Sequence, residues 1–249
     1  MRRPALRTLW LSLAVLVSGC ASFDPVTSTR NAQVAEINTK LGLDYLQKGN
    51  LNLAKSKLNR ALAEDPLSSQ VHWANALLEE RLGDNAKADA LYRKAVRLNP
   101  TDSEGLNFYG VFLCRQGNVT EALAAFEQAV KNPLFTTPEY AYTNAGICAA
   151  QNGFPAQADV YLRNALDKSP NYAMALYHMA LLSYNEQRYL PARAYRQRLE
   201  QAMDATDPKV LWLCFVTEQH LGNLDEARRC EERLKRDFPT SDEANALYR

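Results

Sequence analysis

The chain has 249 residues, a formal net charge of +1 at pH 7, 47% hydrophobic residues and 23% charged residues. This is the composition of an ordinary globular chain, long enough for a large core or an extended array of repeats. Lys and Arg alternate with Asp and Glu, and no basic stripe interleaved with aromatic residues occurs. A nucleic-acid partner is therefore not expected.

Residues 1–19 differ in kind from the rest of the chain. Arg2, Arg3 and Arg7 form a basic head, and LWLSLAVLV at residues 9–17 is an apolar run of nine. A membrane-spanning helix needs about 20 apolar residues, so this run is about half as long as required. The pattern predicts a cleaved lipoprotein signal peptide over residues 1–19 rather than a transmembrane anchor.

The end of this segment, VSGC at residues 17–20, resembles the lipobox of bacterial lipoproteins. The resemblance implies that the thiol of Cys20 is acylated, that the preceding bond is cut, and that the new terminus receives a further chain. Three acyl chains would attach the protein permanently, whereas one myristoyl-length chain binds a membrane only marginally. Ala21 and Ser22 after the cysteine imply delivery to the periplasmic face of the outer membrane. The alternative is ordinary cleavage after Gly19, with Cys20 as a spare thiol.

Residues 20–34 are expected to form a lipidated flexible tether. The stretch ASFDPVTSTRNAQV at residues 21–34 contains Pro25, four Ser or Thr residues and little apolar content. Such a composition is typical of a linker.

From residue 35 the sequence repeats with a period of 34, and small residues, a turn glycine and a final proline recur at the spacings of the tetratricopeptide motif. The units are residues 35–68, 69–102 and 103–136 and, after an insertion of two residues, 139–172, 173–206 and 208–241. The fifth unit is degenerate and carries Gln187 where the glycine belongs. Within a unit, the small residue of the first helix, such as Gly110, is expected to let the second helix approach at Ala122.

One pair of helices cannot bury its own apolar face, so stacked units share a core and wind into a superhelix. The sequence therefore predicts an all-α, right-handed superhelical solenoid of six tetratricopeptide repeats over residues 35–249. It has about twelve antiparallel helices, and residues 242–249 are expected to form a short helix that caps the last unit.

The sequence carries no pattern typical of an enzyme. His72, His178 and His220 lie singly in different units and are expected to be surface or core imidazoles. No nucleophile elbow, phosphate-binding loop or dinucleotide fingerprint occurs. We therefore expect no catalysis, cofactor, metal or small-molecule substrate.

Four further cysteines lie in the repeat domain, and an exported domain sits in an oxidising compartment where paired thiols persist. Cys214 and Cys230 occupy core-directed positions of two antiparallel helices in the sixth unit, which favours a disulfide. Cys114 and Cys148 lie on the first helices of units three and four. Equivalent positions in neighbouring units are too far apart for the ~4.4–6.8 Å Cα separation of a disulfide, but a stagger of two residues and the local insertion can close that gap. Free buried thiols are the alternative for both pairs.

The first helix of each unit lines the concave face of such an array, and its ninth position is apolar in every unit. The candidate partner groove consists of Leu43, Leu46, Trp73, Leu77, Val111, Ile147, Tyr177, Tyr184 and Trp212. The clamp of Lys and Asn with which some tetratricopeptide co-chaperones hold a terminal carboxylate is missing. We expect an apolar, aromatic-lined groove for a segment of a partner protein. The alternative is that these side chains merely fill the gaps between repeats.

With lipobox, tether and six units, the chain resembles the type IV pilus biogenesis and stability lipoproteins, the PilW/PilF family. The resemblance runs from VSGC to the terminal DFPTS at residues 237–241 and includes YLPAR at residues 189–193 of the fifth unit. It implies a pilotin-like protein that brings a PilQ-type pilus secretin to the outer membrane, or steadies its ring and the emerging fibre. By analogy, the secretin would contact the groove of the first units at Leu43 and Leu46. A periplasmic adaptor for cell-wall hydrolases or outer-membrane assembly is the alternative.

Overall fold

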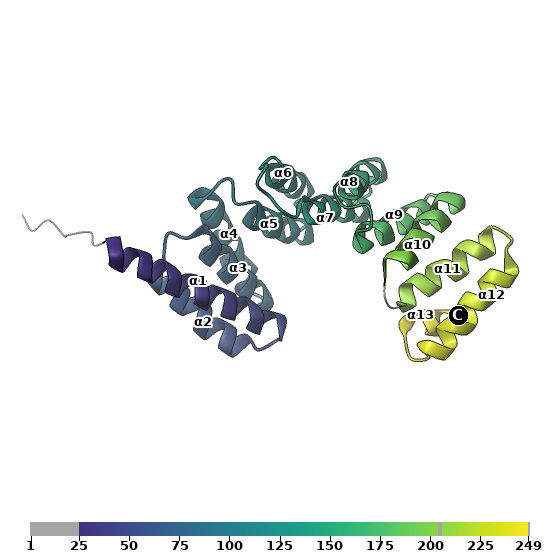
Figure 1. Ribbon diagram of the computed structural model, residues 1–249, viewed down its shortest axis with the longest axis horizontal. Coiled ribbons are helices and arrows are strands. Elements are labelled where there is room, and N and C mark those ends of the chain that lie inside the picture. The colour runs from purple at the N-terminus through teal and green to yellow at the C-terminus, as the bar shows by residue number, and fades with distance from the viewer. Residues whose placement is uncertain (1–24, 204–205, 249) are drawn as a thin grey trace, which may run out of the picture.

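The computed structural model describes residues 25–203 and 206–248, which form thirteen helices and no strands. The helices are α1 (Pro25–Gln47), α2 (Leu51–Glu64), α3 (Ser69–Leu82), α4 (Asn85–Leu98), α5 (Ser103–Arg115), α6 (Val119–Val130), α7 (Pro138–Gln151), α8 (Pro155–Lys168), α9 (Ala173–Asn185), α10 (Tyr189–Ala202), α11 (Pro208–His220), α12 (Leu224–Asp237) and α13 (Asp242–Ala246). Consecutive helices form hairpins, and the six hairpins stack side by side into an arch (Figure 1). The predicted tetratricopeptide solenoid is confirmed. The predicted signal peptide and Cys20 lie outside the described residues.

The start of α1 corrects the expected flexible tether, because the helix already begins at Pro25. Proline is well tolerated in the first turn of a helix, and residues 26–41 contain neither glycine nor a second proline. Further along, Ala35 packs against Ala61 and Val71 of the next two helices, which fixes α1 on the array. As a result α1 has 23 residues, whereas α3 has 14.

The turns between paired helices depend on left-handed backbone conformations. Gly83 and Gly153 have φ of 83° and 82°, values that cost glycine nothing. Gln187 takes the same place in the fifth unit, and among the described residues it is the one non-glycine with positive φ, at 59°. The geometry of the turn therefore persists in the degenerate unit, at a cost in backbone strain.

Paired helices approach closely where the first helix carries a small residue. A Cβ atom on Gly110 would lie 2.7 Å from the ring of Phe126 on α6, which no real side chain tolerates. The sequence predicted a close approach at Ala122; the three nearest atoms all belong to Phe126, one helical turn later, whereas in unit four the predicted Ala158 supplies a backbone oxygen 3.3 Å from a Cβ on Gly146. The larger ring closes the space because it sits directly over the glycine.

The interior of the arch is a row of hydrophobic clusters. The largest runs from Leu46 on α1 to Cys148 on α7, and a second begins at Ala149 and ends at Val210. At the C-terminal end, α13 places Ala244 against Leu211 and Leu234 and so covers the last unit, as the capping role predicts.

Candidate partner-binding groove

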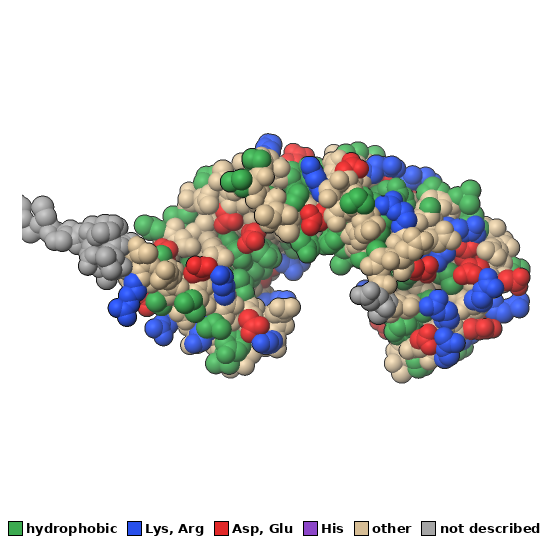
Figure 2. All heavy atoms as spheres, in the orientation of Figure 1, with side chains coloured by type: hydrophobic (Ala, Val, Ile, Leu, Met, Phe, Trp, Pro, Cys, Tyr) green, Lys and Arg blue, Asp and Glu red, His purple; other side chains and the backbone are tan. Residues whose placement is uncertain are grey.

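The first helices of the units line the inner side of the arch. Figure 1 shows α5 and α7 on this inner side and α6 and α8 on the outer side. In the space-filling view the molecule is hollowed beneath its middle, between the first and last units (Figure 2). The concave face predicted from the repeat pattern is therefore the open face of the arch.

Two cavities lie beside α9. The first, of about 400 Å³, is lined by α9, α10 and α11, and includes Met174, Tyr177 and Leu199. The second, of about 290 Å³, is lined mainly by α7, the start of α8, and α9, and includes Ile147 and Ala150. His178 and Leu181 line both cavities, so the two cavities adjoin at α9, and together they are called the groove below.

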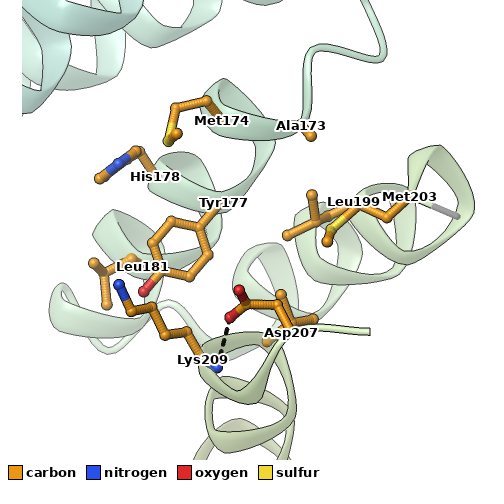
Figure 3. A pocket seen from close by; sticks show the side chains of 10 residues that line it. Ala173, Met174, Tyr177, His178, Leu181, Leu199, Met203, Asp207 and Lys209 are labelled. Carbon is orange, nitrogen blue, oxygen red and sulfur yellow. Dashed lines mark hydrogen bonds between the residues drawn. The ribbon is translucent and has the colours of Figure 1, made fainter. Parts of the chain in front are cut away.

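Figure 3 shows how side chains from three helices surround the first cavity. The ring of Tyr177 lies between Leu181 of its own helix and Leu199 and Met203 of α10. On the α11 side, Asp207 accepts a hydrogen bond of 2.8 Å from the backbone N–H of Lys209 and so caps that helix. The Asp207 carboxylate therefore lies at the first cavity together with Lys209, and its charge helps to raise the pKa of Tyr177. The Lys209 ammonium makes no ion pair with any described residue.

His178 is neutral at physiological pH. Burial lowers its pKa to about 4, and the nearby positive charge of Lys209 adds to this shift. Burial also raises the pKa of Tyr177, whose ring meets the imidazole edge to face at 5.1 Å between centroids. The groove therefore presents an uncharged imidazole, which can both donate and accept a hydrogen bond.

The structure divides the nine predicted groove residues into four groups, of which the last, Leu46 and Trp73, is buried. Ile147 and Tyr177 line the two cavities. Leu43, Leu77 and Val111 are half-buried and pack against the first hydrophobic cluster. Tyr184 and Trp212 pack together in a cluster between units five and six, with their rings edge to face at 6.1 Å.

Leu46 and Trp73 correct the prediction, because their side chains are only 6% and 2% exposed. Trp73 stacks on Phe108 of the next unit at 4.8 Å, and its indole N–H donates to Asp102 at 3.1 Å. A partner could not reach Trp73 without displacing these neighbours. For this residue the alternative of a side chain that fills the gap between repeats is the right one.

The sequence did not predict two of the residues that line the groove. Met174 is 49% exposed at the mouth of the first cavity, and His178 stands where both cavities meet. From the sequence, His178 was expected to be an ordinary surface or core imidazole. The sequence does carry a signal for His178. Leu181 is the apolar residue at the ninth position of the first helix of unit five, and it lies three residues further on the same helix and therefore on the same face.

Both proposed cysteine pairs are disulfides in the structure. Cys114 and Cys148 link α5 to α7 with a Cα separation of 5.9 Å, and Cys214 and Cys230 link α11 to α12 with one of 6.0 Å. Glu226 lies close to the second pair. As a disulfide this pair offers no thiolate to a metal ion.

Among the described helices, none combines the length and the apolar character needed to cross a bilayer.

Comparisons with known proteins agree with this architecture. The tetratricopeptide repeat family model matches residues 39–103, 74–134 and 113–158. The chain is 32% identical over 233 residues to the type IV pilus assembly protein PilF of Pseudomonas aeruginosa, covering 92% of each chain. The crystal structure of PilW, a widely conserved type IV pilus biogenesis factor, matches with a TM-score of 0.79 and 28% identity, over 87% of this chain and 99% of that one. A structure of P. aeruginosa PilF matches with a TM-score of 0.76 and 30% identity, over 88% and 98% of the two chains. The chain therefore belongs to the PilF/PilW family of tetratricopeptide-repeat proteins of type IV pilus biogenesis.

Proposed function

We propose that the protein is an outer-membrane lipoprotein that acts as a scaffold in type IV pilus biogenesis. It is anchored by acyl chains on Cys20, and its concave groove binds the PilQ-type pilus secretin or stabilises the fibre. The observation that carries the proposal is the apolar groove at His178 and Leu181, because it offers binding surface in a protein whose relatives serve pilus biogenesis.

The position of the anchor supports a role close to the membrane. Residues 21–24 separate Cys20 from Pro25 at the start of α1, and the five steps from Cα to Cα between them span at most about 17 Å. The array that carries the groove would then stay tethered to the membrane, which raises the local concentration of a membrane-bound partner. Modest contacts in the groove are sufficient under these conditions.

A Cys20→Ala variant tests the anchor. The repeat array should fold as before, with an unchanged circular dichroism spectrum, but the protein should leave the membrane fraction and secretin multimers should decrease in the outer membrane. A Cys20→Ala protein that stays membrane-bound and fully active would contradict the proposal.

Deletion of the whole protein separates the two pilus roles from the adaptor role. Loss of secretin multimers supports a role in secretin assembly, and normal multimers with unstable pili support a role in fibre stability. Altered cell-wall turnover with intact pili would instead favour the periplasmic adaptor. Co-purification with the secretin provides the direct readout of binding.

A further inference from the structure

We propose that the open N-terminal end of the arch is a docking surface for an anionic phospholipid bilayer, on which α1 lies along the membrane. This inference goes beyond the proposed function and rests on its lipid anchor. The docking face consists of Ile37, Lys40 and Leu41 of α1 and Lys57 of α2.

The two ends of the arch differ in how they are covered. At the C-terminal end, the short helix α13 packs on the last unit. At the N-terminal end, α1 contacts only α2 and α3 among the described helices, and the first hairpin forms the end of the arch (Figure 1). The terminal units of a repeat array need a polar outer face to stay soluble. Apolar residues on the outer face of the first unit would therefore indicate a surface that is covered by something else.

The repeat identifies the residues of this outer face. Val71 of unit two lies in a cluster with alanines of α1 and α2, and the Asn75 side chain donates to the Leu58 carbonyl at 3.3 Å. These two positions of a unit therefore face the preceding unit. In unit one, 34 residues earlier, the same positions hold Ile37 and Leu41. With no described unit before them, these two side chains are 58% and 39% exposed.

Two lysines belong to the same face. Lys40 takes the position of Ala74, which is completely buried in unit two. Lys57 takes the position of Tyr161 in unit four, whose hydroxyl donates to Glu127 of the preceding unit at 2.6 Å. Figure 2 shows basic and hydrophobic side chains next to one another over the first hairpin. The first unit thus carries exposed apolar and basic side chains where later units contact a neighbour.

Charge selects an anionic surface as the occupant. Residues 25–64 contain six Lys or Arg and three Asp or Glu, a net charge of +3, whereas residues 65–249 contain 20 and 24, a net charge of −4. Basic side chains are attracted to an anionic membrane within about one Debye length, ~8 Å at physiological salt. A second copy of the chain fits less well, because a two-fold interface would place the same basic patch against itself.

The short link to Cys20 lets this face reach the bilayer. At most about 17 Å separate Cys20 from Pro25. Ile37 lies twelve residues further along α1, which is about 18 Å at the rise of a helix. When α1 lies along the membrane, Ile37 and Leu41 can therefore enter the headgroup region, as the apolar face of an interfacial helix does.

The test measures contact between the docking face and lipid in the acylated protein on vesicles of phosphatidylethanolamine and phosphatidylglycerol with brominated acyl chains, which quench nearby tryptophan. Ile37→Trp places a tryptophan on the face, and Leu134→Trp, at an 83% exposed position between α6 and α7, is the matched control. The apolar face of an interfacial helix lies about 5–10 Å deep, so the added fluorescence of Ile37→Trp should be quenched at least about threefold more than that of Leu134→Trp. Wild-type protein supplies the background of Trp73 and Trp212.

Charge reversal tests the preference for anionic lipid. Added to Ile37→Trp, Lys40→Glu and Lys57→Glu should lower the quenching at least about twofold on these vesicles. On vesicles of phosphatidylcholine alone, which carry no net charge, the two changes should make no difference. Lys40→Glu removes only an exposed ion pair with Glu36, so circular dichroism should show an unchanged fold.

Each contrary result has a defined meaning. Equal quenching of Ile37→Trp and Leu134→Trp on vesicles that carry the protein overturns the inference and leaves the lipid anchor standing. Unchanged quenching after charge reversal also overturns it. Dimers of the Cys20→Ala protein in which the tryptophan of Ile37→Trp is shielded from acrylamide would assign the face to a second copy instead. If the wild-type protein produced in cells is not acylated and does not float with the vesicles, the anchor and the inference fail together.

Discussion

The two halves of the arch bury their interiors differently. From α1 to the first helix of unit four, one large hydrophobic cluster runs from Leu46 to Cys148, beside a small one of Ala35, Ala61 and Val71. Beyond that point the described interior divides into three clusters, and residues of the first of these line both cavities of the groove. The N-terminal half is thus built around continuous packing, whereas the C-terminal half leaves apolar surface available to a partner.

The two halves also differ in how their buried carboxylates are paired. In the N-terminal half, Glu79 pairs with Lys87, whose side chain is largely exposed. In the C-terminal half, Glu218 is 1% exposed and accepts hydrogen bonds from Arg193 and from Arg196, which is itself 3% exposed. Burial raises the pKa of Glu218, but the hydrogen bond and charge of Arg193 and the charge of Arg196 outweigh it, so this pKa lies below its usual value. The integrity of units five and six therefore depends on one ionic network.

The largest expected effect is that of Glu218→Ala. It removes a buried carboxylate that pairs with both Arg193 and Arg196 and leaves Arg196 with Glu200 alone, and removing one member of a buried ion pair costs about 3–5 kcal/mol. Hydrogen exchange should show that amides of α10 and α11 lose protection first, while those of α3 and α5 keep theirs. Asp44→Ala, which removes an exposed pair with Lys48, is the control and should cost at most about 1 kcal/mol. Uniform loss of protection along the arch would contradict the comparison.

The two disulfides are the next test, because one links units three and four next to the boundary between the halves, and the other lies within the last unit. On the chain-entropy model, the sequence separations of 34 and 16 correspond to about 4 and about 3 kcal/mol. Replacing both Cys114 and Cys148 by Ala should destabilise the protein more and should also uncouple the halves. Urea unfolding should then show two transitions, whereas the Cys214→Ala and Cys230→Ala double variant should keep one. Two transitions in the second variant alone would contradict the prediction.

The sequence predicted what is periodic in this protein. The spacing of small residues, turn glycines and prolines identified the helix hairpins, and the helix positions of the cysteines indicated both disulfides. These features depend on contacts within a unit or between adjacent units, which recur from repeat to repeat. Gln187 shows how far the pattern holds, because it keeps the left-handed turn without the glycine.

What the sequence could not predict depends on individual neighbours. Trp73 occupies a groove position, but Phe108 of the next unit covers it, and only the structure reveals that neighbour. The repeat motif also gave no reason to extend α1 back to Pro25, because those residues precede the first unit. His178 was missed because its importance comes from two cavities whose sizes are set by side chains on α7, α10 and α11.

Acid should weaken the C-terminal half through His178. The imidazole has a pKa of about 4 in the folded protein and about 6.5 when unfolded, so the unfolded chain binds the proton more readily. Stability should therefore be complete above pH 6.5 and fall as the pH drops towards 4, by up to about 3 kcal/mol. His178→Gln should remove this component, as measured by urea unfolding between pH 7.5 and pH 4.5. Burial also lowers the pKa of His72, so a residual acid loss is expected in the variant.

The control for this prediction lies at higher pH. Above pH 7 the imidazole is neutral in both states, so the stability difference between wild type and His178→Gln should no longer change with pH. A difference that keeps changing between pH 7 and pH 8.5 would mean that another group is responsible.

The smallest expected effect compares the turn of the fifth unit with those of its neighbours. Gln187 holds a φ of 59°, a conformation that costs a residue with a side chain about 1–2 kcal/mol and glycine almost nothing. Gln187→Gly removes this strain but gives the unfolded chain more freedom, which offsets about 0.4–1 kcal/mol of the gain. The free energy of unfolding should therefore rise by no more than about 1.6 kcal/mol. The reverse change, Gly153→Gln, should lower the free energy of unfolding by about 1 kcal/mol. No atom lies within 4 Å of a Cβ added at Gly153, so the cost comes from the left-handed backbone conformation alone. If Gln187→Gly instead destabilised the protein, contacts of the glutamine side chain would have to hold the turn, and the fifth unit would owe its shape to more than the repeat.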